Sequence, residues 1–123
     1  MLNNRQEFGK ESESLAVNSL KKQGYEILET NFKTKIGEID IIARDGDTLV
    51  FVEVKARKTL RYGDPKYAIT WHKKRKISLT ALYYLKKTGR MNVRARFDVV
   101  SILEDGNRPL VEIVKNAFEC VTR

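Results

Sequence analysis

Residues 36–58 read IGEIDIIARDGDTLVFVEVKARK, and this stretch decides the fold. Residues 36–43 and 48–55 are rich in Ile and Val, as β-strands are, and Asp45-Gly46 between them is a hairpin signal. The run Val50-Phe51-Val52 is apolar at every position, which is typical of a strand that is buried on both faces. We therefore expect an antiparallel hairpin in the interior of the protein.

Two carboxylates and a lysine interrupt this apolar hairpin. Strand residues of like parity share a face, which places Glu53 with Lys55. A two-residue turn at Asp45-Gly46 sets Asp40 diagonal to Glu53, whereas a turn at Gly46-Asp47 sets the two carboxylates directly opposite each other. Both registers bring Asp40, Glu53 and Lys55 to one face, but an odd-length loop or a bulge would not.

This group of side chains fits a divalent metal ion. Buried charges are costly unless they are paired or bind a metal, and neighbouring carboxylates repel each other unless a cation lies between them. Mg²⁺ prefers oxygen ligands, so we expect Asp40, Glu53 and the Val54 carbonyl to be ligands. Lys55 would lie beside the metal-bound water, where it could help to deprotonate the water or neutralise charge on a phosphate.

The first helix offers a third carboxylate. Glu13 shares a helical face with Ala16 and Leu20, so it is expected to point toward the sheet and to complete the metal site. Glu38 shares parity with Asp40, but we expect it at the periphery.

Ordinary structural roles compete with the metal site. Glu53 and Lys55 could form an ion pair on an exposed sheet face, with Asp40 in solvent. Asp98, on a later apolar strand, is expected to form a buried structural ion pair.

The remaining pattern predicts a mixed central β-sheet flanked by helices, in the order α-β-β-β-α-β-β. Thr70 is expected to cap the second helix, and Trp71 to anchor that helix in the core. The length of 123 residues predicts one domain over residues 1–123. The expected helices are 4–23 and 70–87, and the further strands are 25–32, 96–103 and 110–114.

The net charge of +8 is concentrated in one segment. Lys and Arg number 24 and Asp and Glu 16 in the whole chain, and residues 55–76 contain nine of the basic groups and one acid. Phosphates of nucleic acid, most simply DNA, are the partners that such a segment favours. The candidate contacts are Arg57, Lys58, Arg61, Tyr62, Lys66, Lys73, Lys74, Arg75 and Lys76.

Several protein classes are excluded. The chain has no apolar run long enough for a membrane span, and its first residues lack the apolar core of a signal peptide. The single cysteine, Cys120, cannot form an internal disulfide, and no Cys/His cluster has zinc spacing. A cytoplasmic location is the expectation that follows.

The motifs Gly37–Ala43 and Phe51–Arg57 resemble the core of the PD-(D/E)XK nuclease superfamily. With Gly9–Ala16, Lys73–Ile77 and Arg96–Val100, the chain more closely resembles the small bacterial YraN-like family, which is related to Holliday junction resolvases.

The resemblance implies a restriction-endonuclease-like fold and Mg²⁺- or Mn²⁺-dependent hydrolysis of phosphodiester bonds in DNA. Branched DNA is an implied substrate, and a homodimer an implied assembly. The superfamily's helical acid falls on Glu13, its motif aspartate on Asp40, and its ExK pair on Glu53 and Lys55.

Three functions stay open at this point. A metal-dependent endonuclease is the leading interpretation. A non-catalytic nucleic-acid-binding module on a nuclease scaffold is the alternative, and an adaptor whose basic segment binds an acidic protein is the third.

Overall fold

A computed structural model describes residues 4–58, 69–105 and 108–122. It confirms the expected order of two helices and five strands. The elements are α1 (Asn4–Lys22), β1 (Glu26–Lys33), β2 (Glu38–Asp45), β3 (Thr48–Arg57), α2 (Trp71–Lys87), β4 (Arg94–Asp105) and β5 (Arg108–Phe118).

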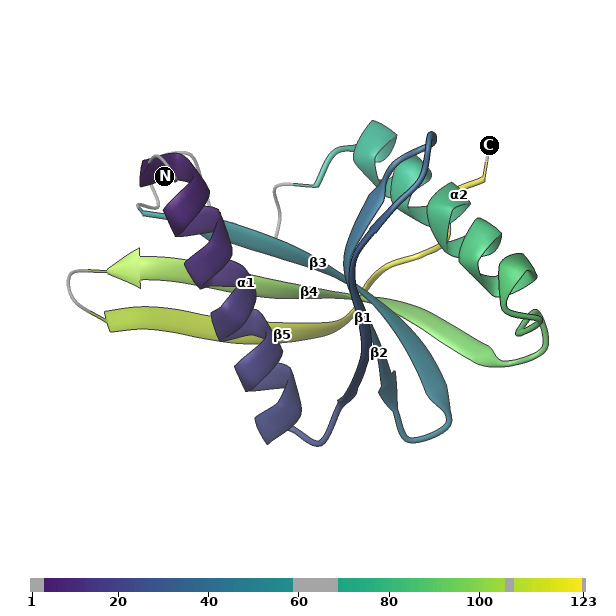
Figure 1. Cartoon of the computed structure of the whole chain (residues 1–123), viewed down its shortest axis with the longest axis horizontal. Coiled ribbons are helices and arrows are strands. Elements are labelled where there is room, and N and C mark those ends of the chain that lie inside the picture. Colours follow the sequence, from purple (N-terminus) through teal and green to yellow (C-terminus); the bar gives the residue numbers. More distant parts are fainter. Residues whose placement is uncertain (1–3, 59–68, 106–107, 123) are drawn as a thin grey trace.

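The strands form one mixed sheet in the order β1-β2-β3-β4-β5 (Figure 1). Neighbouring strands are antiparallel except β3 and β4, which are parallel. A parallel pair needs a long crossover connection, and the segment that contains α2 supplies it. The parallel pair joins Thr48–Arg57 to Arg94–Leu103 without interruption, so β3 has a fixed partner along its whole length.

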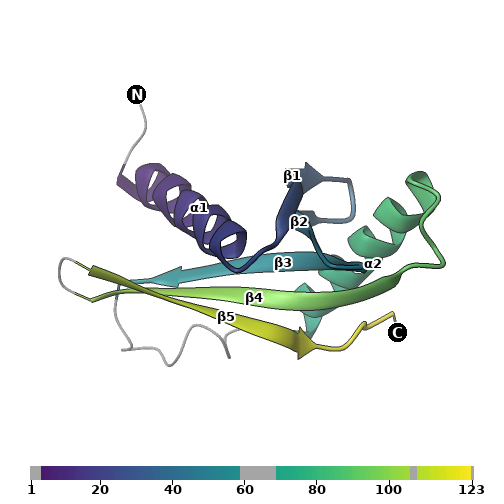
Figure 2. The ribbon, with the colours of Figure 1, turned by 90° about the horizontal axis from the view of Figure 1, so that it is seen from below.

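The two helices cover opposite faces of the sheet. Ala16 and Leu20 of α1 pack in one apolar cluster with Val50 and Val52, while α2 packs in a second cluster that includes Phe51. Alternate residues of β3 therefore enter the two clusters, as expected for a strand buried on both faces. Figure 2 shows α1 lying across one face of β3, β4 and β5.

The β1–β2 hairpin bends away from the rest of the sheet. Pairing of β2 with β3 runs from Asp45↔Thr48 to Ile41↔Val52 and goes no further. This register corresponds to the turn at Gly46-Asp47, one of the two alternatives expected from the sequence. We call the region beyond the Ile41↔Val52 pair, where the two strands part, the fork (Figure 1).

The start of α2 differs from expectation in one respect. Thr70 is the cap, because its hydroxyl accepts a hydrogen bond from the Lys73 amide at 3.1 Å. Trp71, however, is 51 % exposed and does not anchor the helix in the core. It is the first residue of the helix, and the buried face begins only at Ile77.

No helix among the described residues is both long and apolar enough to cross a membrane.

Candidate functional site

Asp40 lies at the fork and is bonded to the neighbouring strand. Its Oδ2 accepts a hydrogen bond from the Val54 amide at 2.8 Å. A strand residue directs its N–H and C=O toward the same edge, so the Val54 carbonyl also faces the side that β2 leaves open. The carboxylate of Asp40 and the carbonyl of Val54 are thus brought together as predicted.

Glu53 is the neighbouring carboxylate and is almost fully buried. It is 5 % exposed, and its Oε2 has no hydrogen-bond partner among the described residues. Its Oε1 lies 3.7 Å from the Nζ of Lys73, which reaches it from the first turn of α2. A buried carboxylate oxygen without a partner is destabilising, and a bound cation at the fork would satisfy it.

Asp40 and Glu53 approach the fork from different sides. Regular alternation predicts a shared face, but β2 does not alternate regularly here, because Ile39 packs in the α2-side cluster and Ile41 in the α1-side cluster. Asp40 lines a groove beneath α1, whereas Glu53 contacts α2. The shared-face prediction is therefore wrong in detail, since it assumed a regular strand where β2 separates from β3.

The two carboxylates still influence each other electrostatically. Burial, followed by the negative charge of Asp40, raises the pKa of Glu53 to about 7, against the opposing effects of Lys73 and Lys55. Burial also raises the pKa of Asp40, while the Val54 hydrogen bond and Lys73 oppose the rise. A cation at the fork would relieve this repulsion and favour the ionised form of both groups.

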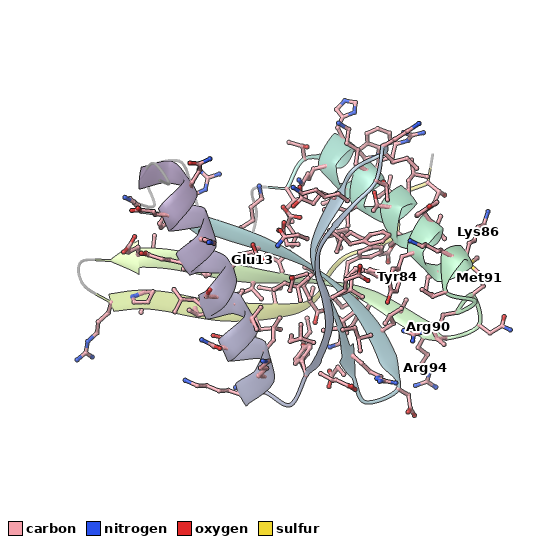
Figure 3. The ribbon with its side chains drawn as sticks, in the orientation of Figure 1. Glu13, Tyr84, Lys86, Arg90, Met91 and Arg94 are labelled. Atoms are coloured by element: carbon pink, nitrogen blue, oxygen red, sulfur yellow. The ribbon has the colours of Figure 1, made fainter. Side chains whose placement is uncertain are left out.

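Glu13 is half-buried on the side of α1 that is toward the β1–β2 hairpin (Figure 3). It lines the same groove as Asp40, and its Oε1 accepts a hydrogen bond from the Asn31 side chain at 2.6 Å. Glu38 lines this groove too, and its charge contributes to the raised pKa of Asp40. The groove has a volume of about 470 Å³ and is lined by Phe8, Gly9, Ser12, Glu13, Asn31, Glu38, Asp40, Val54 and Ala56.

Asn31 is a site residue that the sequence did not reveal. The β1–β2 register, continued between its neighbouring pairs, sets Asn31 opposite Asp40. Its φ of 53° is left-handed, which turns the chain locally and is tolerated by Asn better than by most residues. A lone Asn in a strand of mixed polarity gives no signal of this role.

The donor set at the fork suits a hard divalent cation. Within the described ranges, no three acidic, histidine or cysteine side chains converge closely enough to hold a metal ion by themselves. Mg²⁺, however, is commonly held by one or two carboxylates, with waters and substrate phosphates as the other ligands. Asp40, the unpartnered oxygen of Glu53 and the Val54 carbonyl are donors of this kind, with Glu13 further along the groove.

Comparison with known proteins identifies the family. Residues 12–102 match the model of the uncharacterised protein family UPF0102. The chain belongs to the UPF0102 family. A UPF0102 protein of Desulfosudis oleivorans is 53 % identical over 119 residues, covering 97 % of this chain and 95 % of its own. A relative from Geobacter metallireducens is 51 % identical over 112 residues, and these cover 91 % of this chain and 92 % of that one.

The segment shared with the UPF0102 family contains the whole fork. Glu13, Asp40, Glu53 and Lys55 all lie between residues 12 and 102. The names of these relatives state a family and no activity, and the chemistry of the site follows from its own geometry.

Few of the predicted nucleic-acid contacts lie directly at the fork. Lys73 contacts Glu53, and Lys58 lies with its Nζ 5.1 Å from the ring centre of Phe8, beside the groove. Lys74 lies over the ring of Phe118 instead, at 5.8 Å. Arg57, Arg75 and Lys76 are on the surface of β3 and α2, and Arg61, Tyr62 and Lys66 lie outside the described residues.

A second group of cations lies outside residues 55–76, and the net charge of the chain does not reveal it. Lys86, Arg90 and Arg94 are spread around the end of α2 and the start of β4 (Figure 3). Residues 65–97 contain no acid, so α2 carries positive charge at both ends. Acids elsewhere in the chain balance these cations in number but not in space.

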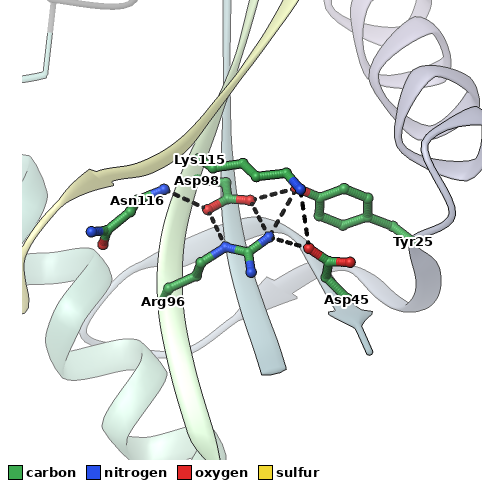
Figure 4. Close-up of polar contacts among 6 residues, drawn as sticks. All are labelled: Tyr25, Asp45, Arg96, Asp98, Lys115 and Asn116. Atoms are coloured by element: carbon green, nitrogen blue, oxygen red, sulfur yellow. Dashed lines mark hydrogen bonds and ion pairs between the residues drawn. The ribbon is translucent and has the colours of Figure 1, made fainter. Parts of the chain in front are cut away.

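Asp98 forms the buried structural ion pair that the sequence predicted. It is fully buried and accepts hydrogen bonds from Arg96, from the Tyr25 hydroxyl at 2.8 Å and from the Asn116 amide at 2.9 Å. Arg96 also bonds Asp45 at the end of β2 (Figure 4). Burial and the Asp98 bond raise the pKa of Tyr25 to about 12, so the hydroxyl remains a donor. The network joins β2, β4 and β5 to Tyr25, the residue that precedes β1, away from the fork.

Proposed function

We propose that this UPF0102 protein is a metal-dependent endonuclease that hydrolyses phosphodiester bonds in DNA at the fork. The observation that carries the proposal is the buried, unpartnered Oε2 of Glu53 beside the carboxylate of Asp40. Two coupled carboxylates that favour a cation, next to a cation-rich surface that favours phosphate, match the requirements of phosphodiester hydrolysis.

Each residue of the fork has a role in this proposal. Asp40, Glu53 and the Val54 carbonyl hold Mg²⁺ or Mn²⁺, and Glu13 supports it through water. The bound ion would supply Lewis-acid stabilisation of charge on the phosphate. Lys55 is two residues beyond Glu53 on β3, and its charge lowers the pKa of that carboxyl. In its charged form it would orient the attacking water, and in its neutral form it would accept the proton of that water.

Metal binding is the first test, since it needs no substrate. We expect Mn²⁺ to bind the wild-type protein in calorimetric titration and to bind neither Asp40→Asn nor Glu53→Gln. Glu26→Gln is the matched control, because Glu26 is an exposed strand carboxylate paired with Arg44. Equal Mn²⁺ binding by all variants would contradict the assignment of the fork as the metal centre.

Cleavage is the second test. We expect linear, nicked and branched DNA to be cut in the presence of Mg²⁺ or Mn²⁺, and Lys55→Ala to lose at least 100-fold in rate, a typical contribution of a proton-transfer group. Unchanged activity in Lys55→Ala would reject catalysis at this site. A preference for branched DNA, a homodimer and a cytoplasmic location follow from the resemblance and the single cysteine, and belong to the proposal.

A non-catalytic nucleic-acid-binding module is the second candidate. It is favoured by the absence, within the described residues, of three converging metal-ligating side chains, and by the engagement of Glu13 with Asn31. This function predicts salt-sensitive DNA binding that survives Asp40→Asn, with no cleavage in any metal. The acidic-partner adaptor would instead show no affinity for DNA or RNA at low salt.

A further inference from the structure

We propose that Lys73 exchanges partners during function: it neutralises Glu53 in the metal-free protein and moves to a nucleic-acid phosphate once a divalent cation is bound. This inference rests on the proposed function and adds to it a residue from α2 that couples metal binding to DNA binding. The sequence predicts Lys73 only as one of several surface cations.

Lys73 and Glu53 differ in how far their side chains are exposed to solvent. The Glu53 side chain is 6 % exposed, while the Lys73 side chain is 43 % exposed. The Nζ–Oε1 distance of 3.7 Å is too long for a direct hydrogen bond. The lysine head therefore compensates the buried charge without being locked to it, and it has solvent into which it can move.

The base of Lys73 is fixed while its head is free. The Lys73 amide donates to the Thr70 hydroxyl at the helix cap, which holds the backbone in place. Four rotatable carbons separate this anchor from the ammonium, so the head can sweep several ångströms without any movement of α2. A change of partner requires only rotamer changes.

Charge balance supplies the driving force. Lys73 lowers the pKa of both Glu53 and Asp40, so its single positive charge serves both carboxylates of the fork. A divalent ion at the same place would balance both negative charges by itself. Lys73 would then face a fork whose carboxylate charges are already balanced, and a phosphate outside the fork would be its better partner.

The neighbouring cations do not share this position. Lys74 lies over Phe118, and Lys76 is exposed on the same helix. Lys76 is therefore the matched control, since it has the same charge and secondary structure and, within the described part of the chain, forms no ion pair with a fork carboxylate. Removing it should weaken phosphate binding whether or not metal is present.

The first experiment measures Mn²⁺ alone. All variants are measured at the same pH, about 8.5. We expect Lys73→Met to bind Mn²⁺ roughly 3- to 10-fold more tightly than wild type, because the competing ammonium of Lys73 has been removed. Lys76→Met should match wild type, and Lys73→Arg should match it as well, since the charge is kept. Unchanged or weaker binding by Lys73→Met would overturn the exchange.

The second experiment measures DNA affinity by fluorescence anisotropy, with and without Ca²⁺, an oxygen-seeking ion chosen to limit turnover. Wild type should gain affinity when Ca²⁺ is added, and Lys73→Met should lose at least two-thirds of that gain. Lys76→Met should lose the same factor in both conditions, as a phosphate contact alone would. An equal loss by Lys73→Met in both conditions would overturn the coupling.

The two proposals can fail separately. Wild type that binds no divalent ion overturns the proposed function and the exchange together. The exchange alone is overturned if wild type binds metal and cleaves DNA, and if Lys73→Met gains as much DNA affinity from Ca²⁺ as wild type does.

Discussion

A carboxylate that is buried and lacks a partner at one oxygen disfavours the folded state whenever it is ionised. Glu53 is in this position, and burial with the charge of Asp40 raises its pKa from the ordinary 4.5 to about 7. The folded protein thus keeps a proton on Glu53 at pH values where the unfolded chain has released it. Stability should be highest below the unfolded pKa and fall as pH rises through that window.

We expect the free energy of unfolding of the metal-free wild type to fall, relative to that of Glu53→Gln, by about 3 kcal/mol between pH 4.5 and pH 7, because folding raises the pKa of Glu53 to about 7. Urea denaturation in EDTA at several pH values measures this difference. Glu26→Gln, which alters an exposed carboxylate, should run parallel to wild type. A wild-type curve parallel to that of Glu53→Gln would show that Glu53 titrates normally.

Asp98 shows the opposite use of a buried carboxylate. Its oxygens accept bonds from Tyr25, Arg96 and the Asn116 amide, so its charge is compensated. Asp98→Asn leaves Arg96 without its buried partner, and we expect it to cost about 3–5 kcal/mol in urea denaturation. Glu26→Gln breaks an exposed pair and should cost at most about 1 kcal/mol. A loss that small in Asp98→Asn would mean that the network contributes little to stability.

At the scale of elements, the distance between α2 and the β1–β2 hairpin depends on one glycine. A Cβ at Gly37 would lie 3.1 Å from the Thr80 hydroxyl and 3.3 Å from the Lys76 Cβ, both on α2. A Cβ at Gly9, within α1, would meet nothing within 4 Å. The same substitution at these two positions should therefore have opposite effects.

We expect Gly37→Ala to destabilise the protein by about 1–2 kcal/mol through overpacking between the hairpin and α2. Gly9→Ala should stabilise it by about 0.5–1 kcal/mol, because alanine favours the helix. Thermal and urea denaturation of the two variants compare the signs directly. A stabilising Gly37→Ala would show that α2 can move outward at no cost, and that the hairpin does not fix its position.

The bounds of β3, which packs on both faces, could be predicted closely from the sequence. The bounds of the edge strand β5 could be predicted less closely. The apolar run in β3 predicts a strand over residues 48–55, and the structure has a strand over Thr48–Arg57. β5 was expected at 110–114 but extends over Arg108–Phe118, because pairing with β4 holds it although most of its residues are exposed. Apolar patterning reports burial, and it underestimates a strand held mainly by backbone pairing.

At the scale of the whole molecule, the site depends on contacts that no local pattern contains. Glu53 meets Lys73 because the crossover brings α2 back to β3, and Glu13 meets Asn31 because α1 lies across the sheet beside β1. The chemical types of Asp40, Glu53 and Lys55 could be predicted from spacing. The bend at which β2 leaves β3, which sets their directions, could not, since it arises from the twist of the assembled sheet.

The fork should make metal binding visible in the stability of the entire chain. A ligand that binds only the folded state stabilises it by about 2.7 kcal/mol at 100 times its Kd, which for a domain of this size raises Tm by roughly 10 °C. We expect Mn²⁺ to produce such a rise in wild type at pH 8, where Glu53 is largely ionised. Asp40→Asn and Glu53→Gln remove the ligands and should show no rise, whereas Asp98→Asn lowers the starting Tm but should keep the increment. A rise of equal size in Asp40→Asn would place the ion elsewhere, because Glu53 and the Val54 carbonyl would then lack the second carboxylate that the proposed site requires.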